Sequence, residues 1–241
     1  MLALLHTSPV HVPVFDALRD EDHPGLPLRH LVHEELLDRA RREGPGAVAG
    51  EVRAAVEGAV RDGARAVLCT CSTLGSVAEG LGTAVPVLRV DRPMATAAIA
   101  AAMATAGPRG HALGDHAGHD GPIGRGGPAT PAVLVLATVD STLGPTVALV
   151  EEEARRAGRT VTVRSRLVDG AWDRFTAGDT EGCARLVAAA ADTVTDADAI
   201  VLAQASMAPA ERLVTTALPV LSSPRPGLAA AVVATRPGER G

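Results

Sequence analysis

Residues 66–73 have the sequence AVLCTCST, and residues 199–206, which begin 133 positions later, have the sequence AIVLAQAS. The same offset aligns VPVL at residues 85–88 with LPVL at residues 218–221. Two matching blocks at one offset indicate an internal repeat, so we expect two halves with one architecture. Within the repeat, Cys71 corresponds to Gln204, which is the only glutamine of the chain.

Short apolar runs alternate with amphipathic or alanine-rich segments in both halves. This alternation is typical of an α/β fold with parallel sheets. We therefore expect two pseudo-symmetric lobes, each a parallel sheet flanked by helices, with a cleft between them. The expected strands are residues 2–5, 28–32, 66–69, 85–90, 133–136, 161–167, 200–203 and 219–221. The expected helices are residues 12–18, 47–62, 73 onward, 94–106, 142–157, 179–191, 208–216 and 228–234.

The repeat also predicts the domain boundaries. We expect residues 1–106 to form an N-terminal α/β lobe, whose last helix could pack either on its own lobe or on the other one. We expect residues 132–234 to form a C-terminal α/β lobe. Between them, residues 107–131 are rich in glycine, proline and histidine and predict a flexible insertion. Residues 235–241 predict a disordered tail.

Two histidine pairs raise the question of a metal site. His116 and His119 lie in the insertion, where glycines on every side fix no ligand geometry, so we expect a solvated loop. His30 and His33, followed by Glu34, have the spacing of one helical face, and we expect an ordinary surface helix start. We predict no metal.

Composition excludes several classes of protein. The net charge of -5 and the three aromatic residues provide neither a basic footprint nor stacking platforms for nucleic acid. No apolar run reaches the length of a membrane span. The chain has no lysine, which excludes a pyridoxal-phosphate Schiff base and a Walker-type phosphate loop. We expect no cofactor.

The expected compartment follows from the cysteines and the first residues. Three cysteines, two of them at positions 69 and 71, do not make a disulfide framework, so we expect a reducing cytoplasm. Residues 1–13 carry no basic segment before the apolar run and predict a first strand instead of a signal peptide.

Small hydroxyl side chains gather where the expected strands end. In parallel sheets, ligands bind beyond the carboxyl ends of strands. The residues at these ends include Thr7 and Ser8, residues 71–73, residues 138–142 and residues 204–206.

Three motifs resemble the aspartate/glutamate racemase superfamily. Cys71-Ser72-Thr73 resembles its Cys-Asn-Thr motif, with serine in place of asparagine. Residues 202–207, LAQASM, resemble the Leu-Gly-Cys-Ala-Gly-Met stretch of hydantoin racemases, with glutamine in place of cysteine. Residues 136–138 followed by Thr142 resemble the Ala-Thr…Thr segment that opens the second half. The resemblance implies two similar lobes around a cleft, cofactor-free chemistry on a small carboxylate, and a homodimer or higher oligomer.

The residue types suit this chemistry. A thiolate stabilised by a helix N-terminus can remove a proton from a carbon next to a carboxylate, and Cys71 is our candidate catalytic thiol. Backbone N–H groups and hydroxyls can hold the substrate carboxylate. The candidate binding residues are Ser8, Ser72, Thr73, Thr138, Thr142, Gln204 and Ser206; each single hydroxyl is alternatively a helix cap or turn residue. We expect Cys69 and Cys183 in the core.

Gln204 separates the chain from a plain two-base racemase, because an amide cannot act as an acid or base. Three interpretations remain open. The first is an isomerase or lyase with one cysteine. The second is a racemase whose other proton donor is His6 or a bound water. The third is a carboxylate-binding or regulatory protein without turnover.

Overall fold

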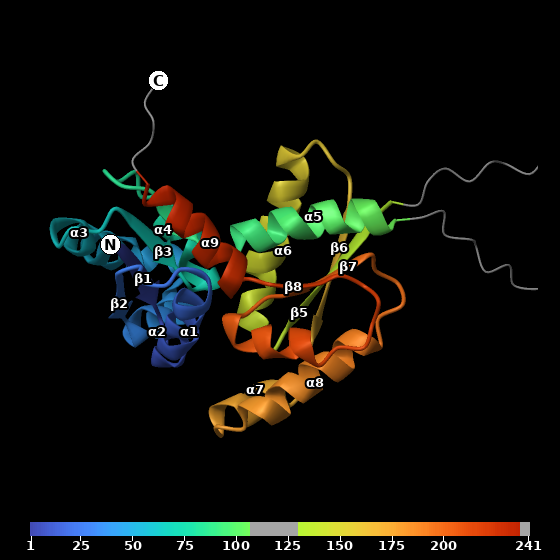
Figure 1. Cartoon of the computed structure of the whole chain (residues 1–241). Coiled ribbons are helices and arrows are strands. Elements are labelled where there is room, and N and C mark those ends of the chain that lie inside the picture. The colour runs from blue at the N-terminus through green and yellow to red at the C-terminus, as the bar shows by residue number, and fades with distance from the viewer. Residues whose placement is uncertain (107–129, 237–241) are drawn as a thin grey trace, which may run out of the picture.

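The computed structural model describes residues 1–106 and 130–236, which form two four-stranded parallel sheets with helices packed on them (Figure 1). The predicted insertion lies outside the described residues except for Thr130 and Pro131, and residues 237–241 of the predicted tail also lie outside them. The predicted α/β class with two similar lobes is confirmed.

The two sheets have the same topology. The first sheet has the order β2-β1-β3-β4, with strands β1 (Leu2–His6), β2 (Leu28–Val32), β3 (Ala66–Cys69) and β4 (Val87–Arg89). The second has the order β6-β5-β7-β8, with strands β5 (Ala132–Ala137), β6 (Thr162–Leu167), β7 (Ala199–Leu202) and β8 (Val220–Ser222). The central strands β1, β3, β5 and β7 are buried along their whole length, as expected for strands covered on both faces.

The helices also repeat in order along the chain. The first half has α1 (Val12–Asp22), α2 (Glu34–Glu43), α3 (Ala49–Arg61), α4 (Ser72–Glu79) and α5 (Arg92–Thr105), with 3₁₀ turns η1 (Pro9–His11) and η2 (Pro45–Val48). The second half has α6 (Asp140–Arg156), α7 (Ala171–Thr176), α8 (Thr180–Asp192), the 3₁₀ helix η3 (Ala205–Arg212) and α9 (Pro224–Ala234). Within residues 1–106 and 130–236, none of the helices is long and apolar enough to cross a membrane.

The last helix of each half packs on the sheet of the other half. Helix α5 buries Met94, Ala98 and Ile99 against Val133 and Val201 of the second sheet. Helix α9 buries Leu228 and Ala231 against the first sheet, where strands β1 and β3 meet it. In Figure 1, α9 accordingly lies over the first sheet and α5 over the second. Each lobe therefore consists of the sheet and the earlier helices of one half of the chain, together with the last helix of the other half. The lobes differ in this one helix from the expected domains 1–106 and 132–234.

Three local expectations differ from the structure. The segment expected as a helix over residues 208–216 is instead the 3₁₀ helix η3, which begins at Ala205 and ends at Arg212. Beyond its end, the N–H groups of Thr215 and Thr216 donate to the side chain of Asp192 instead of to helix carbonyls. His30 lies in strand β2, so His30 and His33 do not share a helical face. Helices α2 and α7 were not expected from the sequence pattern.

Gly227 tests the exchange of α9. A Cβ at Gly227 would meet the carbonyl oxygen of Val90 at 2.5 Å, whereas a Cβ at Gly58, in helix α3, would meet nothing closer than 3.7 Å. We expect Gly227→Ala to lower the free energy of unfolding by about 2 kcal/mol, because backbone must move apart. Gly58→Ala, the matched control, should raise it by up to about 1 kcal/mol. Urea unfolding of both variants measures this, and a neutral Gly227→Ala would contradict the tight docking of α9.

Candidate functional site

Cys71 and Gln204 occupy equivalent places in the two lobes. Cys71 follows strand β3 and is the N-cap residue of α4, with extended backbone angles φ -103° and ψ 114°. Gln204 follows strand β7 and is the N-cap residue of η3, with φ -126° and ψ 143°. The thiol and the amide therefore stand at equivalent positions of the two lobes, each directly before the helix that follows the strand.

Backbone hydrogen bonds fix the residue-by-residue equivalence. The N–H of Thr70 donates to the carbonyl of Leu5 at 3.0 Å, and the N–H of Ala203 donates to the carbonyl of Leu136 at 2.9 Å. One residue further on, His6 therefore corresponds to Ala137. The two turns share one backbone scheme with different side chains.

A hydrogen bond between the lobes brings the two turns together. The hydroxyl of Ser72 donates to the carbonyl oxygen of Ala203 at 3.2 Å. Because Ser72 follows Cys71 and Ala203 precedes Gln204, this bond makes the thiol-bearing and amide-bearing turns neighbours. The hydroxyl hydrogen of Ser72 is therefore already used in this bond, whereas we had expected Ser72 to donate it to a substrate carboxylate.

Gln204 is held in one orientation by Thr138. Its side-chain oxygen accepts from the backbone N–H of Thr138 at 2.6 Å and from the Thr138 hydroxyl at 3.0 Å. A backbone N–H is only a donor, so the oxygen of the amide must face Thr138 and the NH₂ group faces away from it. Thr138 thus orients Gln204 and leaves the amide hydrogens to donate elsewhere.

The remaining predicted residues lie around these turns. Thr73 and Thr142 are in the first turns of α4 and α6, two helices that pack against each other. Ser8 is the half-buried N-cap residue of η1, after strand β1. Ser206 lines a groove described below.

The three cysteines differ in environment. The Cys71 residue is 8% exposed, whereas Cys69 is fully buried and Cys183 is 1% exposed. Burial, with a further contribution from Cys71, raises the pKa of Cys69, and burial also raises the pKa of Cys183. All three cysteines belong to core clusters of buried residues, which agrees with the expected core positions of Cys69 and Cys183 and makes Cys71 the most exposed of three buried thiols.

His6, the alternative second proton donor, is buried and contacts two polar side chains. Burial, and then the neighbouring His30 and His11, lower the pKa of His6 to about 3. Its Nδ1 lies 2.8 Å from the hydroxyl of Thr70, and its Nε2 lies 2.8 Å from Nδ1 of His30. At pH 7 the ring is therefore neutral, and protein groups contact both of its nitrogens.

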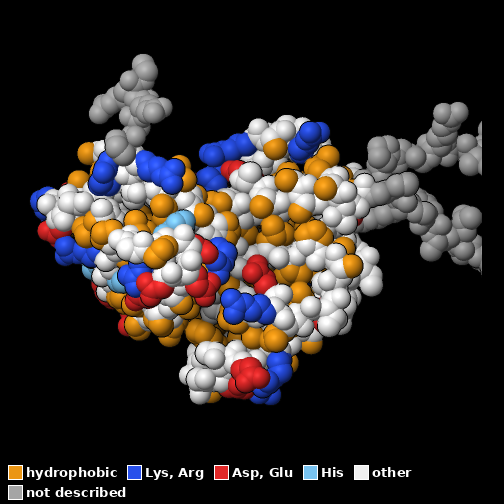
Figure 2. Space-filling model, viewed as in Figure 1, with side chains coloured by type: hydrophobic (Ala, Val, Ile, Leu, Met, Phe, Trp, Pro, Cys, Tyr) orange, Lys and Arg blue, Asp and Glu red, His pale blue; other side chains and the backbone are white. Residues whose placement is uncertain are grey.

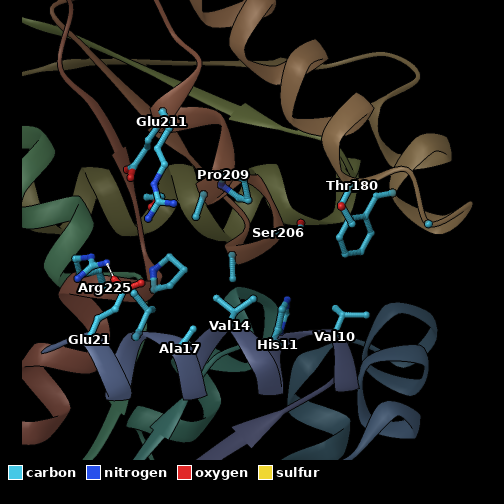
Figure 3. A pocket seen from close by; sticks show the side chains of 18 residues that line it. Val10, His11, Val14, Ala17, Glu21, Thr180, Ser206, Pro209, Glu211 and Arg225 are labelled. Carbon is cyan, nitrogen blue, oxygen red and sulfur yellow. Dashed lines mark hydrogen bonds and ion pairs between the residues drawn. The ribbon is translucent and has the colours of Figure 1, made fainter. Parts of the chain in front are cut away.

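A groove of about 540 Å³ opens between α1 and η3. It begins at Ala205 and Ser206, directly after Gln204, and Cys71 is not among the residues that line it. In Figure 3, His11 of η1 and Val14 and Ala17 of α1 point toward Ser206 and Pro209 of η3. Phe175 also lines the groove, as do charged side chains, among them Arg225, which pairs with Glu21. The space-filling view shows the corresponding hollow between the lobes, with charged side chains on both sides of it (Figure 2).

Sequence reasoning did not single out several buried polar atoms near the strand ends. Four side-chain atoms are buried without a hydrogen-bond partner among the described residues: His11 Nδ1, Ser141 Oγ, Thr146 Oγ1 and Ser223 Oγ. His11 lines the groove, and burial lowers its pKa to about 4, so it is neutral there at pH 7. The only feature of the sequence that could have identified His11 as a site residue is its position shortly after the end of the first strand.

In the part of the chain that the structure describes, no group of three or more histidine, cysteine or acidic side chains is arranged to hold a metal ion. His116 and His119, the alternative metal pair, lie outside the described residues. The site consists of a thiol, an amide, hydroxyls and neutral imidazoles.

Solved structures share the two-lobed fold. Picrophilus torridus aspartate racemase superimposes with a TM-score of 0.62 at 13% identity, over 97% of this chain and 93% of that one. The chain has the two-lobed fold of the aspartate and glutamate racemases. A glutamate racemase from Bacillus anthracis gives a TM-score of 0.59 at 14% identity, over 97% of this chain and 80% of that one.

Arylmalonate decarboxylase also shares the fold. An arylmalonate decarboxylase with a glycine-to-cysteine substitution, in its sulfate-associated form, gives a TM-score of 0.58 at 20% identity, over 98% of this chain and 96% of that one. No protein-family model matches the chain, and no curated protein matches it significantly. At these identities the likeness establishes the fold.

The lowered pKa of His6 predicts a dependence of stability on pH. In the unfolded chain the imidazole binds a proton below its ordinary pKa of 6.5, whereas folded His6 does so only near pH 3. Stability is therefore present above pH 6.5 and is lost as the pH falls toward 3. His6 alone should remove about 2 kcal/mol of unfolding free energy between pH 7 and pH 5.

Urea unfolding at the two pH values measures this loss, and His6→Asn isolates it. Asparagine keeps an N–H donor near Thr70 and has no group that titrates in this range. The variant should lose less stability than the wild type between pH 7 and pH 5. Equal losses would show that His6 does not carry the effect.

Proposed function

We propose that the chain is a cofactor-independent enzyme of the aspartate/glutamate racemase superfamily, of the isomerase type, that acts on a small carboxylate through the thiolate of Cys71. The observation that supports this most is the position of Cys71. It begins α4 at the carboxyl edge of the first sheet, is slightly exposed, and neighbours the turn of Gln204 from the other lobe.

The chemistry follows from these groups. The Cys71 thiolate takes the proton from the carbon next to the substrate carboxylate, and the electron pair of that C–H bond moves into the carboxylate as an enolate-like state. Donors stabilise the added charge: the backbone N–H groups of the first turn of α4, the Thr73 hydroxyl, and the NH₂ group of Gln204. A proton then returns to the carbon from the thiol or from water.

A decarboxylase acting from one face is the second candidate. Here a C–C bond breaks, its electron pair enters the remaining carboxylate as CO₂ leaves, and the Cys71 thiol gives its proton to the carbon. Gln204 favours this candidate, since an amide cannot supply an acid or base on the opposite face. The similarity to arylmalonate decarboxylase over nearly the whole of both chains supports it as well.

The groove gives a reason to expect a substrate with an uncharged, apolar arm. It starts at Ser206, two residues after Gln204, and is lined by apolar side chains such as Val14, Phe175 and Pro209. Its volume of about 540 Å³ is in the usual range for small-molecule sites. A dimer or higher oligomer and a reducing cytoplasm stay predictions from the sequence.

Hydrogen exchange tests the proposed catalysis. We would incubate the protein in D₂O with amino acids, hydantoins, maleate and arylmalonates, and follow the substrate carbons by proton NMR. At least one compound should show deuterium incorporation, isomerisation or CO₂ loss, and Cys71→Ala should reduce that rate by about 10³-fold, because the proton-transferring group is gone.

Chiral analysis of the product then separates the two candidates. A racemic product indicates isomerisation, and a single enantiomer formed with CO₂ loss indicates the decarboxylase. Cys183→Ala is the matched control, because it removes a core thiol and should leave the rate unchanged. Carboxylate binding without turnover by any compound would instead indicate a binding protein.

Filling the groove tests the expected substrate arm. Val14→Trp should raise the KM of aryl-bearing substrates about tenfold, through lost apolar contact, and leave that of methyl-bearing analogues nearly unchanged. Val233→Trp makes the same substitution on α9, at a residue 60% exposed and outside the groove, and should change neither. An equal effect of Val14→Trp on both substrates would place the arm elsewhere.

A further inference from the structure

Buried polar side chains lie beneath Cys71 and have no counterpart beneath Gln204. In the first lobe they are His6, Cys69 and Thr70; the equivalent residues of the second lobe are Ala137, Leu202 and Ala203. Both sets are buried. The same backbone turn is therefore built once with three polar side chains and once with three apolar ones.

Thr70 and His6 belong to a chain of buried and half-buried polar contacts. The Thr70 hydroxyl lies 3.2 Å from the carbonyl oxygen of Leu5 and 2.8 Å from Nδ1 of His6. His6 Nε2 lies 2.8 Å from Nδ1 of His30, whose Nε2 lies 3.3 Å from a carboxylate oxygen of Asp16. Contacts at both ring nitrogens thus hold His6 in one orientation against Thr70.

Cys69 holds the other side of the turn. Its Sγ lies 3.6 Å from the carbonyl oxygen of Cys71 and donates to it. Burial raises the pKa of Cys69, so this thiol keeps its proton and stays a donor. Residues 70 to 72 are therefore held by three contacts. His6 contacts the side chain of Thr70, Cys69 donates to the carbonyl of Cys71, and Ser72 donates to the other lobe.

The second lobe acts as an internal control. Ala137, Leu202 and Ala203 build the same strand and turn, so the fold itself does not require the polar set. Burying polar groups gains little stability compared with apolar residues. We propose that His6, Thr70 and Cys69 are positioning residues that hold the Cys71 thiol against the carboxylate site. This inference rests on the proposed role of Cys71.

The test compares two alkylating reagents on one thiol. Iodoacetate carries a carboxylate and iodoacetamide does not, and both react with the same thiolate. The ratio of their rates at Cys71, assigned by peptide mass spectrometry, therefore reports how well the thiol is aligned with a carboxylate site and is insensitive to its overall exposure or ionisation. Free cysteine gives the reference ratio.

Four variants complete the experiment. We expect the wild-type ratio to exceed that of free cysteine by about tenfold, because the carboxylate is held next to the thiol. Thr70→Val and His6→Ala should return it toward free cysteine, and Thr70→Ser, which keeps the hydroxyl, should retain it. Thr146→Val is the matched control: it removes a buried hydroxyl that has no hydrogen-bond partner among the described residues, and it should leave the ratio unchanged.

The outcomes separate the two proposals. A high ratio that persists in Thr70→Val and His6→Ala would overturn the positioning role and leave the proposed function standing. A wild-type ratio equal to that of free cysteine would mean that no carboxylate site adjoins Cys71, which would overturn both. Urea unfolding of each variant confirms that the protein measured is folded.

Discussion

The exchange of α5 and α9 is the constraint on which the rest of the molecule depends. Each helix leaves its own sheet and covers an apolar face of the other, so the two sheets are held with their carboxyl edges toward each other. An ionic cluster strengthens this arrangement, since Arg92 at the start of α5 contacts Glu79 of α4 and Glu153 of α6. Only in this arrangement can Ser72 reach the carbonyl of Ala203. The site is therefore a product of packing between the lobes.

The turns at Cys71 and at Gln204 have the same backbone arrangement but carry different side chains. The first carries a thiol above polar side chains, and the second carries an amide whose oxygen is fixed by Thr138. A buried ion pair between Arg89 and Asp91 adds to the difference, because the equivalent residues of the second lobe are Ser222 and Pro224. Arg89 lies so close to Gly75 of α4 that a Cβ there would meet its Nε at 2.9 Å. Buried polar groups are therefore concentrated on the Cys71 side of the site.

The strands and the internal repeat could be predicted from the sequence, because central parallel strands are short apolar runs that end at turn residues. It also located Cys71 and Gln204 as equivalent residues. It could not predict which sheet α9 covers, since Leu228 and Ala231 would suit either. The orientation of Gln204 and the contact of His6 with Thr70 were equally inaccessible, because they join residues 64 or more positions apart. The failure at residues 208–216 has a similar cause, since the N–H groups of Thr215 and Thr216 donate to Asp192, which lies 23 and 24 positions away in the chain.

The exchanged helices have a consequence for how the chain is made. When the first 106 residues have left the ribosome, Leu2, Leu4 and Leu68 form a sheet face that still lacks its cover, because α9 is synthesised more than a hundred residues later. Helix α5 waits in the same way for strands β5 and β7. Contacts between residues so distant in sequence form slowly. Neither half can become a finished unit on its own, and the nascent chain must keep two apolar surfaces from mispairing until its last helix emerges.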